Sequence, residues 1–162
     1  MDRIFVSACI IGRPVRFNGT DNLVRDALMQ QWQEEGRLVP LCPEVAAGFP
    51  TPRAPAEIEP GLNGGAILDG RARVYEDNGT DVTKPFVKGA ELALETARRA
   101  GCRFALLTDG SPSCGSTYQY SGHFDMQTRT GEGVVAALLR RNGIRVFAED
   151  ALQELSEALD KP

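Results

Sequence analysis

Short apolar runs and longer stretches of helical periodicity alternate along the 162-residue chain. Apolar runs with the length expected of buried strands lie at residues 4–9, 38–42, 104–108 and 144–147. Apolar side chains recur every three or four positions elsewhere, which predicts amphipathic helices at residues 21–35, 83–100, 134–141 and 151–159. Strands that alternate with helices predict a three-layer, Rossmann-like α/β fold with a mainly parallel sheet.

Three stretches between these elements lack strong periodicity. Residues 43–62 are rich in proline, which predicts a stiff, irregular loop, and a loop of this length in a compact domain is usually functional. Residues 64–77 are expected to form a hairpin that turns at Asp69-Gly70, because this dipeptide favours tight hairpin turns. Residues 120–133 are expected to form a second hairpin or a lid.

The overall composition is typical of a soluble globular protein, with 42% hydrophobic and 25% charged residues. The length predicts a single domain over residues 1–162. A net charge of -4 and a pI near 5.1 argue against nucleic acids and acidic membrane surfaces as partners. Because we find no signal-peptide pattern and no apolar run that could span a bilayer, we expect a cytoplasmic protein, with a monomer favoured.

Three of the four cysteines lie at the carboxyl ends of predicted strands. Cys9 and Cys42 each end an apolar run, and Cys114 lies in the loop that follows the third run. In a parallel α/β sheet the carboxyl ends of the strands meet at the edge where ligands bind. We therefore expect Cys9, Cys42 and Cys114 to converge on one metal centre. Cys102 precedes its strand, at the opposite edge, and is expected to be structural.

The residues alone leave the identity of this centre open. Compact CxxC pairs are absent from the sequence, so cysteines buried as small hydrophobes are one alternative. Three thiolates suit either zinc, with water or His123 as the fourth ligand, or a cubane iron–sulfur cluster with one iron free of protein ligands. A donor set so poor in histidine favours iron–sulfur. The competing functions are an iron–sulfur electron carrier, a structural zinc module and, last, a thiol-nucleophile enzyme.

Motifs spread over nearly the whole chain resemble one known family. The motifs are SACIIG (residues 7–12), CPEVAAGFPTPRAPAE (42–57), GTDVTKPFVKGAE (79–91) and SPSCG (111–115). Together they resemble the thiouracil desulfidase family. The resemblance implies that Cys9, Cys42 and Cys114 hold a 4Fe–4S cluster whose fourth iron binds the sulfur of a small thiolated pyrimidine. Residues 108–110 depart from the family, in which basic residues often precede the SPSCG motif.

The activity that this resemblance implies is the non-redox conversion of thiouracil and water to uracil and hydrogensulfide. By motif, Glu44 matches the family's catalytic acidic residue and Ser111 its catalytic serine. Glu44 is expected to act as a general base for the attacking water, because burial and a negatively charged cluster would raise its pKa. Ser111 is expected to orient the ring or the water, and Ser113 is a nearby candidate for substrate binding. Arg16 and Arg53 are candidates for binding a substrate carbonyl or phosphate, and a surface position is the alternative for both.

Overall fold

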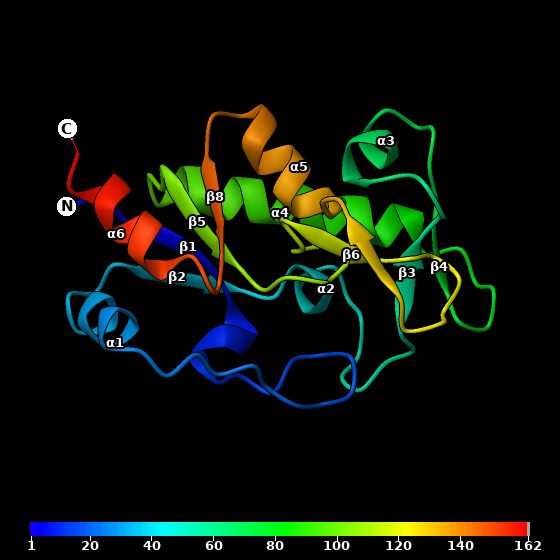
Figure 1. The fold of residues 1–162 in the computed structure, drawn as a ribbon, viewed down its shortest axis with the longest axis horizontal. Helices are drawn as coiled ribbons and strands as arrows, with labels where there is room; N and C mark the ends of the chain where they lie inside the picture. Colours follow the sequence, from blue (N-terminus) through cyan, green and yellow to red (C-terminus); the bar gives the residue numbers. More distant parts are fainter. Residues whose placement is uncertain (162) are drawn as a thin grey trace.

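A four-stranded parallel sheet lies at the centre of the structure, a computed structural model that describes residues 1–161 (Figure 1). Its strands are β1 (Ile4–Ser7), β2 (Leu38–Leu41), β5 (Phe104–Leu107) and β8 (Arg145–Ala148). They are arranged in the order β2-β1-β5-β8, with Ile4 of β1 in register with Leu38 of β2 and Phe104 of β5. The predicted α/β fold with a mainly parallel sheet is confirmed.

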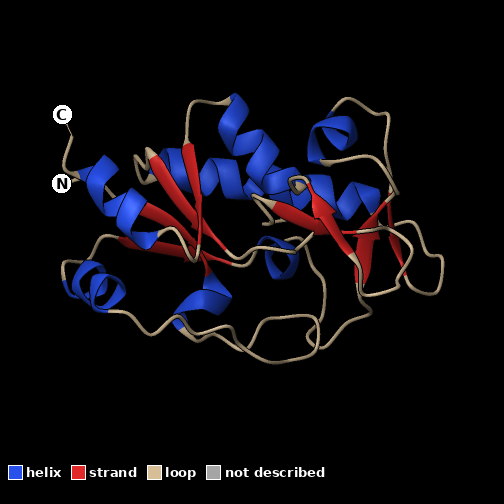
Figure 2. Ribbon diagram, viewed as in Figure 1, coloured by secondary structure: helices blue, strands red, loops and turns tan. Residues whose placement is uncertain are grey.

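Helices cover both faces of this sheet (Figure 2). One face carries α4 (Thr83–Arg99) and α5 (Val134–Arg141), and the other carries α1 (Ala27–Glu34) and α6 (Leu152–Leu159). A further helix, α3 (Gly64–Leu68), packs against α4 and α5. A hydrophobic core lies on each face of the sheet, and successive side chains of β1 point into opposite cores. Phe5 packs with α4 and α5, whereas Ile4 and Val6 pack with α1 and α6. β1 and β5 are buried along their whole length, which explains why they appear in the sequence as continuous apolar runs.

Two antiparallel strand pairs and two short helices complete the fold. β3 (Ala56–Ile58) pairs with β4 (Val74–Glu76), and β6 (Tyr118–Tyr120) pairs with β7 (Thr128–Thr130). The 3-10 helix η1 (Ala8–Ile11) follows β1 directly, and α2 (Pro43–Ala46) follows β2. The hairpin expected at residues 120–133 is present as β6 and β7, although its first strand begins at Tyr118.

The hairpin expected at residues 64–77 is wrong. Residues 64–68 form α3 instead, because the Asn63 side chain caps this helix by accepting a hydrogen bond from the backbone N–H of Ala66. Asp69-Gly70, the expected hairpin turn, lies at the carboxyl end of the helix, where the positive φ of Gly70 stops it. The strand that follows, β4, pairs with β3.

Three other element boundaries differ from the prediction. The first strand ends at Ser7, so that Cys9 lies in η1. The first helix begins at Ala27 and not at residue 21, because the Asp26 side chain accepts a hydrogen bond from the backbone N–H of Leu28 and starts the helix there. The loop expected at residues 43–62 contains α2 and β3, and is therefore less irregular than its prolines indicated.

The helix α4 spans 17 residues and packs closely against α2. A glycine at position 89 makes this possible, because a Cβ there would lie 2.7 Å from the carbonyl oxygen of Pro43. The position of α2, and with it Cys42 and Glu44, thus depends on a helix of the hydrophobic core. Neither α4 nor any other helix within residues 1–161 has the length and hydropathy needed to cross a membrane.

Candidate active site

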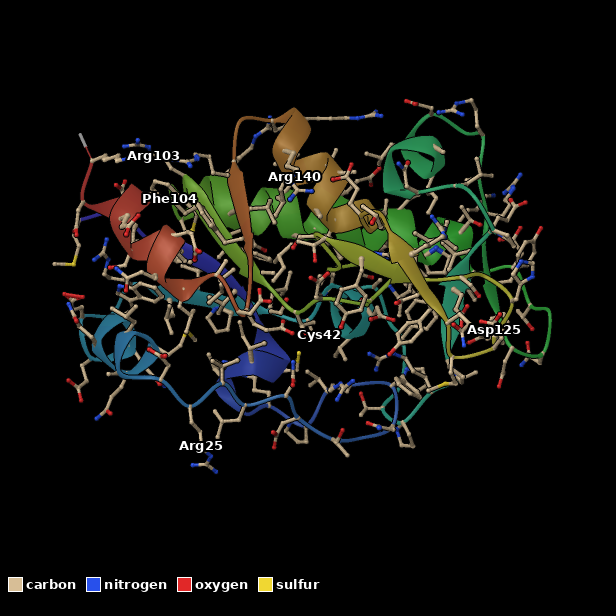
Figure 3. The ribbon with its side chains drawn as sticks, in the orientation of Figure 1. Arg25, Cys42, Arg103, Phe104, Asp125 and Arg140 are labelled. Carbon is tan, nitrogen blue, oxygen red and sulfur yellow. The ribbon has the colours of Figure 1, made fainter. Side chains whose placement is uncertain are left out.

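A cavity of about 320 Å³ lies at the carboxyl ends of the four parallel strands. Every strand of the sheet is followed by a residue that lines it: Cys9 after β1, Cys42 and Glu44 after β2, Ser111 and Cys114 after β5, and Glu149 after β8. Figure 3 shows Cys42 near the middle of the molecule, between the sheet and the long loops below it. The cavity occupies the edge of the sheet at which α/β proteins bind ligands.

The structure brings together the three cysteines that were expected to converge. Cys9 and Cys114 are buried and Cys42 is half-buried, and all three are free thiols. Burial raises the pKa of the Cys9 thiol to about 11, and it raises the pKa of the other two thiols as well. Cys9 and Cys42 raise the pKa of Cys114 further, which indicates that the three sulfurs lie near one another.

The donor set at this edge consists of thiols. Within residues 1–161, no three His, Cys, Asp or Glu side chains lie close enough together to hold one metal ion. The three thiols share one cavity nonetheless, and soft thiolate ligands are those that hold iron–sulfur clusters. His123, the alternative fourth ligand of a zinc ion, is exposed and does not line the cavity.

Cys102 lies apart from the other three cysteines. It precedes β5, at the amino end of the sheet, and packs in the core at 6% exposure. Its position away from the cavity agrees with the structural role expected for it.

Glu44 and Arg53 form an ion pair in the wall of the cavity. Glu44 lies in the first turn of α2, and its Oε1 atom is 3.5 Å from Nε of Arg53. The two side chains are only 17% and 4% exposed. Burial raises the pKa of Glu44, although the nearby guanidinium of Arg53 acts in the opposite direction. The pair thus holds a carboxylate in a sheltered position beside the thiols.

The side chain of Arg53 is buried, in contrast to the surface arginine that was its alternative interpretation. Its guanidinium donates hydrogen bonds to the carbonyl oxygen of Val15 at 2.8 Å and to that of Pro50 at 3.2 Å. Its backbone N–H donates to the carbonyl oxygen of Phe17. Arg53 therefore joins the loop that follows η1 to Glu44, and only its Nε atom lacks a hydrogen-bond partner.

Ser111 lines the cavity and also shapes the loop that carries Cys114. Its Oγ atom accepts hydrogen bonds from the backbone N–H groups of Ser113 and Cys114, at 3.0 and 3.2 Å. Because the oxygen is used as an acceptor, the hydroxyl proton is left to donate elsewhere. Ser113 is buried at 1% exposure and does not line the cavity, so the geometry gives no support to its expected contact with substrate.

Asp109 organises the same loop, a role that the sequence did not reveal. Its Oδ1 atom accepts hydrogen bonds from the backbone N–H groups of Ser116, Thr117 and Tyr118. Burial alone would raise the pKa of Asp109, but these hydrogen bonds and that of the Thr117 hydroxyl hold it below its usual range. The residue stands where the family more often has basic residues, and here it closes the turn between β5 and β6.

The mouth of the cavity is apolar and aromatic. Arg16 lines it and is exposed, on the loop between η1 and α1. Phe17 and Tyr118 are each 39% exposed and Met126, near the tip of the β6–β7 hairpin, is 80% exposed. These side chains line the same cavity as the thiols, so a flat ring that enters it meets apolar surface on the way.

The sequence interpretation missed Glu149 as well. Its carboxylate lines the cavity and accepts a hydrogen bond from the backbone N–H of Asp109 at 2.8 Å. The signal was present in the sequence, since Glu149 lies just after the fourth apolar run, and Cys9 and Cys42 stand at the ends of the first and second.

The fold and the cavity define a parallel α/β protein with a thiol-lined candidate metal centre. The chain belongs to the 2-thiouracil desulfurase family, whose model matches residues 4–151. The uncharacterized protein YbbK of Bacillus subtilis (strain 168) is 38% identical over 152 residues, which cover 94% of this chain and 99% of YbbK. Among solved structures, the 4Fe-4S-dependent thiouracil desulfidase TudS superposes with a TM-score of 0.89, at 46% identity and 98% coverage of both chains.

Proposed function

We propose that this protein is an iron–sulfur-dependent desulfidase that converts a thiolated pyrimidine such as thiouracil and water to uracil and hydrogensulfide. Membership of the 2-thiouracil desulfurase family and the likeness to TudS support this assignment. The observation that carries it is that three thiols and the sheltered carboxylate of Glu44 line a single cavity. The cavity volume of about 320 Å³ is at the lower end of ligand pockets in general.

Cys9, Cys42 and Cys114 are the residues that would hold a 4Fe–4S cluster. Their three sulfurs line the cavity and leave one iron of such a cluster without a protein thiolate. When bound, the cluster supplies a Lewis acid with affinity for soft sulfur, which makes the thione carbon more electrophilic and sulfide a better leaving group.

Glu44 is the candidate general base. In this role its carboxylate accepts a proton from the water that attacks the thione carbon, and burial raises its pKa in the direction that a base near neutrality requires. Arg53 holds the carboxylate in place through the ion pair and stabilises its charge. Neither residue needs to move, because both are fixed by contacts with the protein.

Ser111 is the candidate for orienting the ring or the water. Two backbone N–H groups fix its Oγ atom, so that the hydroxyl proton is free to be donated into the cavity. Arg16 stands at the exposed mouth and is suited to a polar group that projects from the ring, such as a carbonyl or a phosphate.

The test uses protein purified and reconstituted with iron and sulfide in the absence of oxygen. We expect about four irons per chain, the content of one 4Fe–4S cluster, and release of hydrogensulfide and uracil from thiouracil. Replacing any of the three cavity cysteines by alanine should remove iron and turnover. The matched control is Cys102→Ala, which leaves the cavity intact and should keep both.

Glu44→Gln separates catalysis from cluster binding. The substitution keeps the size of the side chain and should keep the iron, but it removes the base and should reduce kcat by about 100-fold or more. Full turnover in this variant would refute the role of Glu44. A protein that holds iron, undergoes reversible one-electron reduction and leaves thiouracil unchanged would be an electron carrier, and the proposed function would then be wrong.

A further inference from the structure

Glu149 is a carboxylate in the wall of the cavity to which the proposed reaction assigns no part. It follows β8, which is the edge strand of the sheet opposite to β2, the strand that precedes Glu44. The two carboxylates therefore enter one cavity from opposite ends of the sheet, with the loops of β1 and β5 between them. A ring that lies over these loops has Glu44 on one side and Glu149 on the other.

The carboxylate of Glu149 is positioned by hydrogen bonding and can still accept further hydrogen bonds. Its Oε2 atom accepts the hydrogen bond from the backbone N–H of Asp109. The adjacent Thr108 is fixed in turn by Asn22, whose side-chain amide donates to the Thr108 hydroxyl oxygen at 2.9 Å. An ionised carboxylate accepts about four hydrogen bonds, so positions facing the cavity are left for a further donor.

The charge of Glu149 also lacks a partner. Among the ion pairs formed by residues 1–161 none includes it, and the nearby ionisable groups Asp109 and Asp150 are acidic. Burial raises the pKa of Glu149, hydrogen bonds from the Asp109 backbone and the Thr108 side chain lower it, and the charges of Asp109 and Asp150 raise it. A half-buried carboxylate in these surroundings gains most from a ligand that brings a hydrogen-bond donor into the cavity.

From these contacts we propose that Glu149 determines specificity by accepting a hydrogen bond from the N3–H group of the pyrimidine ring. This inference rests on the proposed function, which supplies the substrate class. N3 lies between C2 and C4, so its N–H group is adjacent to the thione carbon in both the 2-thio and the 4-thio isomer. A ring whose N3 carries a lone pair instead, as in cytosine-type bases, presents an acceptor to a carboxylate and is disfavoured.

The test compares two substrates and four proteins: wild type, Glu149→Gln, Glu149→Ala and a control variant. Glu149→Gln keeps an oxygen that accepts from the Asp109 N–H group, and so preserves the support of the loop, but it turns an amide donor towards the ring. We expect KM for 4-thiouracil to rise about 10- to 100-fold in this variant with a smaller change in kcat, since a hydrogen bond to a charged group is lost. For N3-methyl-4-thiouracil, which has no N3–H group, wild type and Glu149→Gln should have the same KM.

Asp150→Asn is the matched control, because Asp150 is the exposed neighbour of Glu149, does not line the cavity and carries the same charge. Its KM should equal that of wild type. Binding of the product uracil, measured by calorimetry, gives a second readout without turnover and should weaken by the same factor in Glu149→Gln.

Three outcomes separate the possibilities. Equal KM values for 4-thiouracil in wild type and Glu149→Gln would overturn the inference while leaving the desulfidase activity established. If Glu149→Ala is impaired and Glu149→Gln is not, the residue only supports the Asp109 loop, and the inference is again wrong. If wild type releases no hydrogensulfide, the proposed function itself fails, and unchanged uracil binding in Glu149→Gln would overturn the inference separately.

Discussion

The ion pair between Glu44 and Arg53 makes the sharpest prediction about stability. Arg53→Gln removes a guanidinium that is 4% exposed and leaves Glu44, which is 17% exposed, without its cation. Breaking a buried pair in this way costs about 3–5 kcal/mol, and the partial exposure of Glu44 places the expected loss near 3 kcal/mol. Glu44→Gln leaves the hydrogen bonds of Arg53 to Val15 and Pro50 in place, so about 1 kcal/mol is expected.

The double variant tests whether the two residues stabilise each other. It contains no unpaired buried carboxylate, so it should lose about 1–2 kcal/mol less than the sum of the two single variants. The free energies of unfolding of wild type, the two single variants and the double variant form a double-mutant cycle. They are measured by urea unfolding of metal-free protein at pH 7 in a reducing buffer. Arg99→Gln, which breaks the exposed pair of Arg99 with Glu95 on α4, is the control and should cost at most about 0.5 kcal/mol.

Additive losses, within about 0.5 kcal/mol, would refute this reasoning. Arg53→Gln also bears on activity, because both Nη atoms of Arg53 donate to loop carbonyls and its Nε atom faces Glu44. Arg53→Gln should therefore lower kcat more than it raises KM. A rise in KM with unchanged kcat would instead mean that Arg53 binds substrate directly.

Two further predictions concern the supports of the cavity. Asp109→Ala removes the acceptor of three backbone N–H groups and should cost about 2–4 kcal/mol in urea unfolding. Because the folded pKa of Asp109 is lowered, its contribution is present above about pH 4 and is lost as the pH falls further, so wild type and Asp109→Asn should converge in stability at low pH. Gly89→Ala places a Cβ 2.7 Å from the Pro43 carbonyl and should cost about 1–3 kcal/mol and reduce turnover, whereas Lys88→Ala on the exposed face should change neither.

The parallel sheet could be predicted because its strands are buried on both faces. Phe5 and its neighbours Ile4 and Val6 must all be apolar when helices cover both sides, and this produces the uninterrupted runs. The convergence of three loops on one edge then follows from the handedness of the connections. The antiparallel strands were harder to predict from the sequence. β3 and β4 have three residues each and are specified by their contacts with each other more than by their own hydrophobic pattern.

The side chains of the site were predictable only where a motif or a strand end marked them. Cys114 stands in a recognisable motif, whereas the burial of Arg53 depends on the carbonyls of Val15 and Pro50, which lie in two separate loops. Ser111 and Ser113 have the same chemistry and differ only in which of them lines the cavity. Such distinctions come from tertiary contacts, and no local pattern contains them.

The order of the strands has a consequence for how the protein is made. β1 lies between β2 and β5 in the sheet, although β5 belongs to the second half of the chain. During synthesis, Cys9 and Cys42 therefore emerge from the ribosome long before Cys114, and the first half of the chain displays two thiols without the third. The complete set of proposed ligands exists only after β5 has inserted beside β1, so loading of the proposed cluster would be a late, post-translational event.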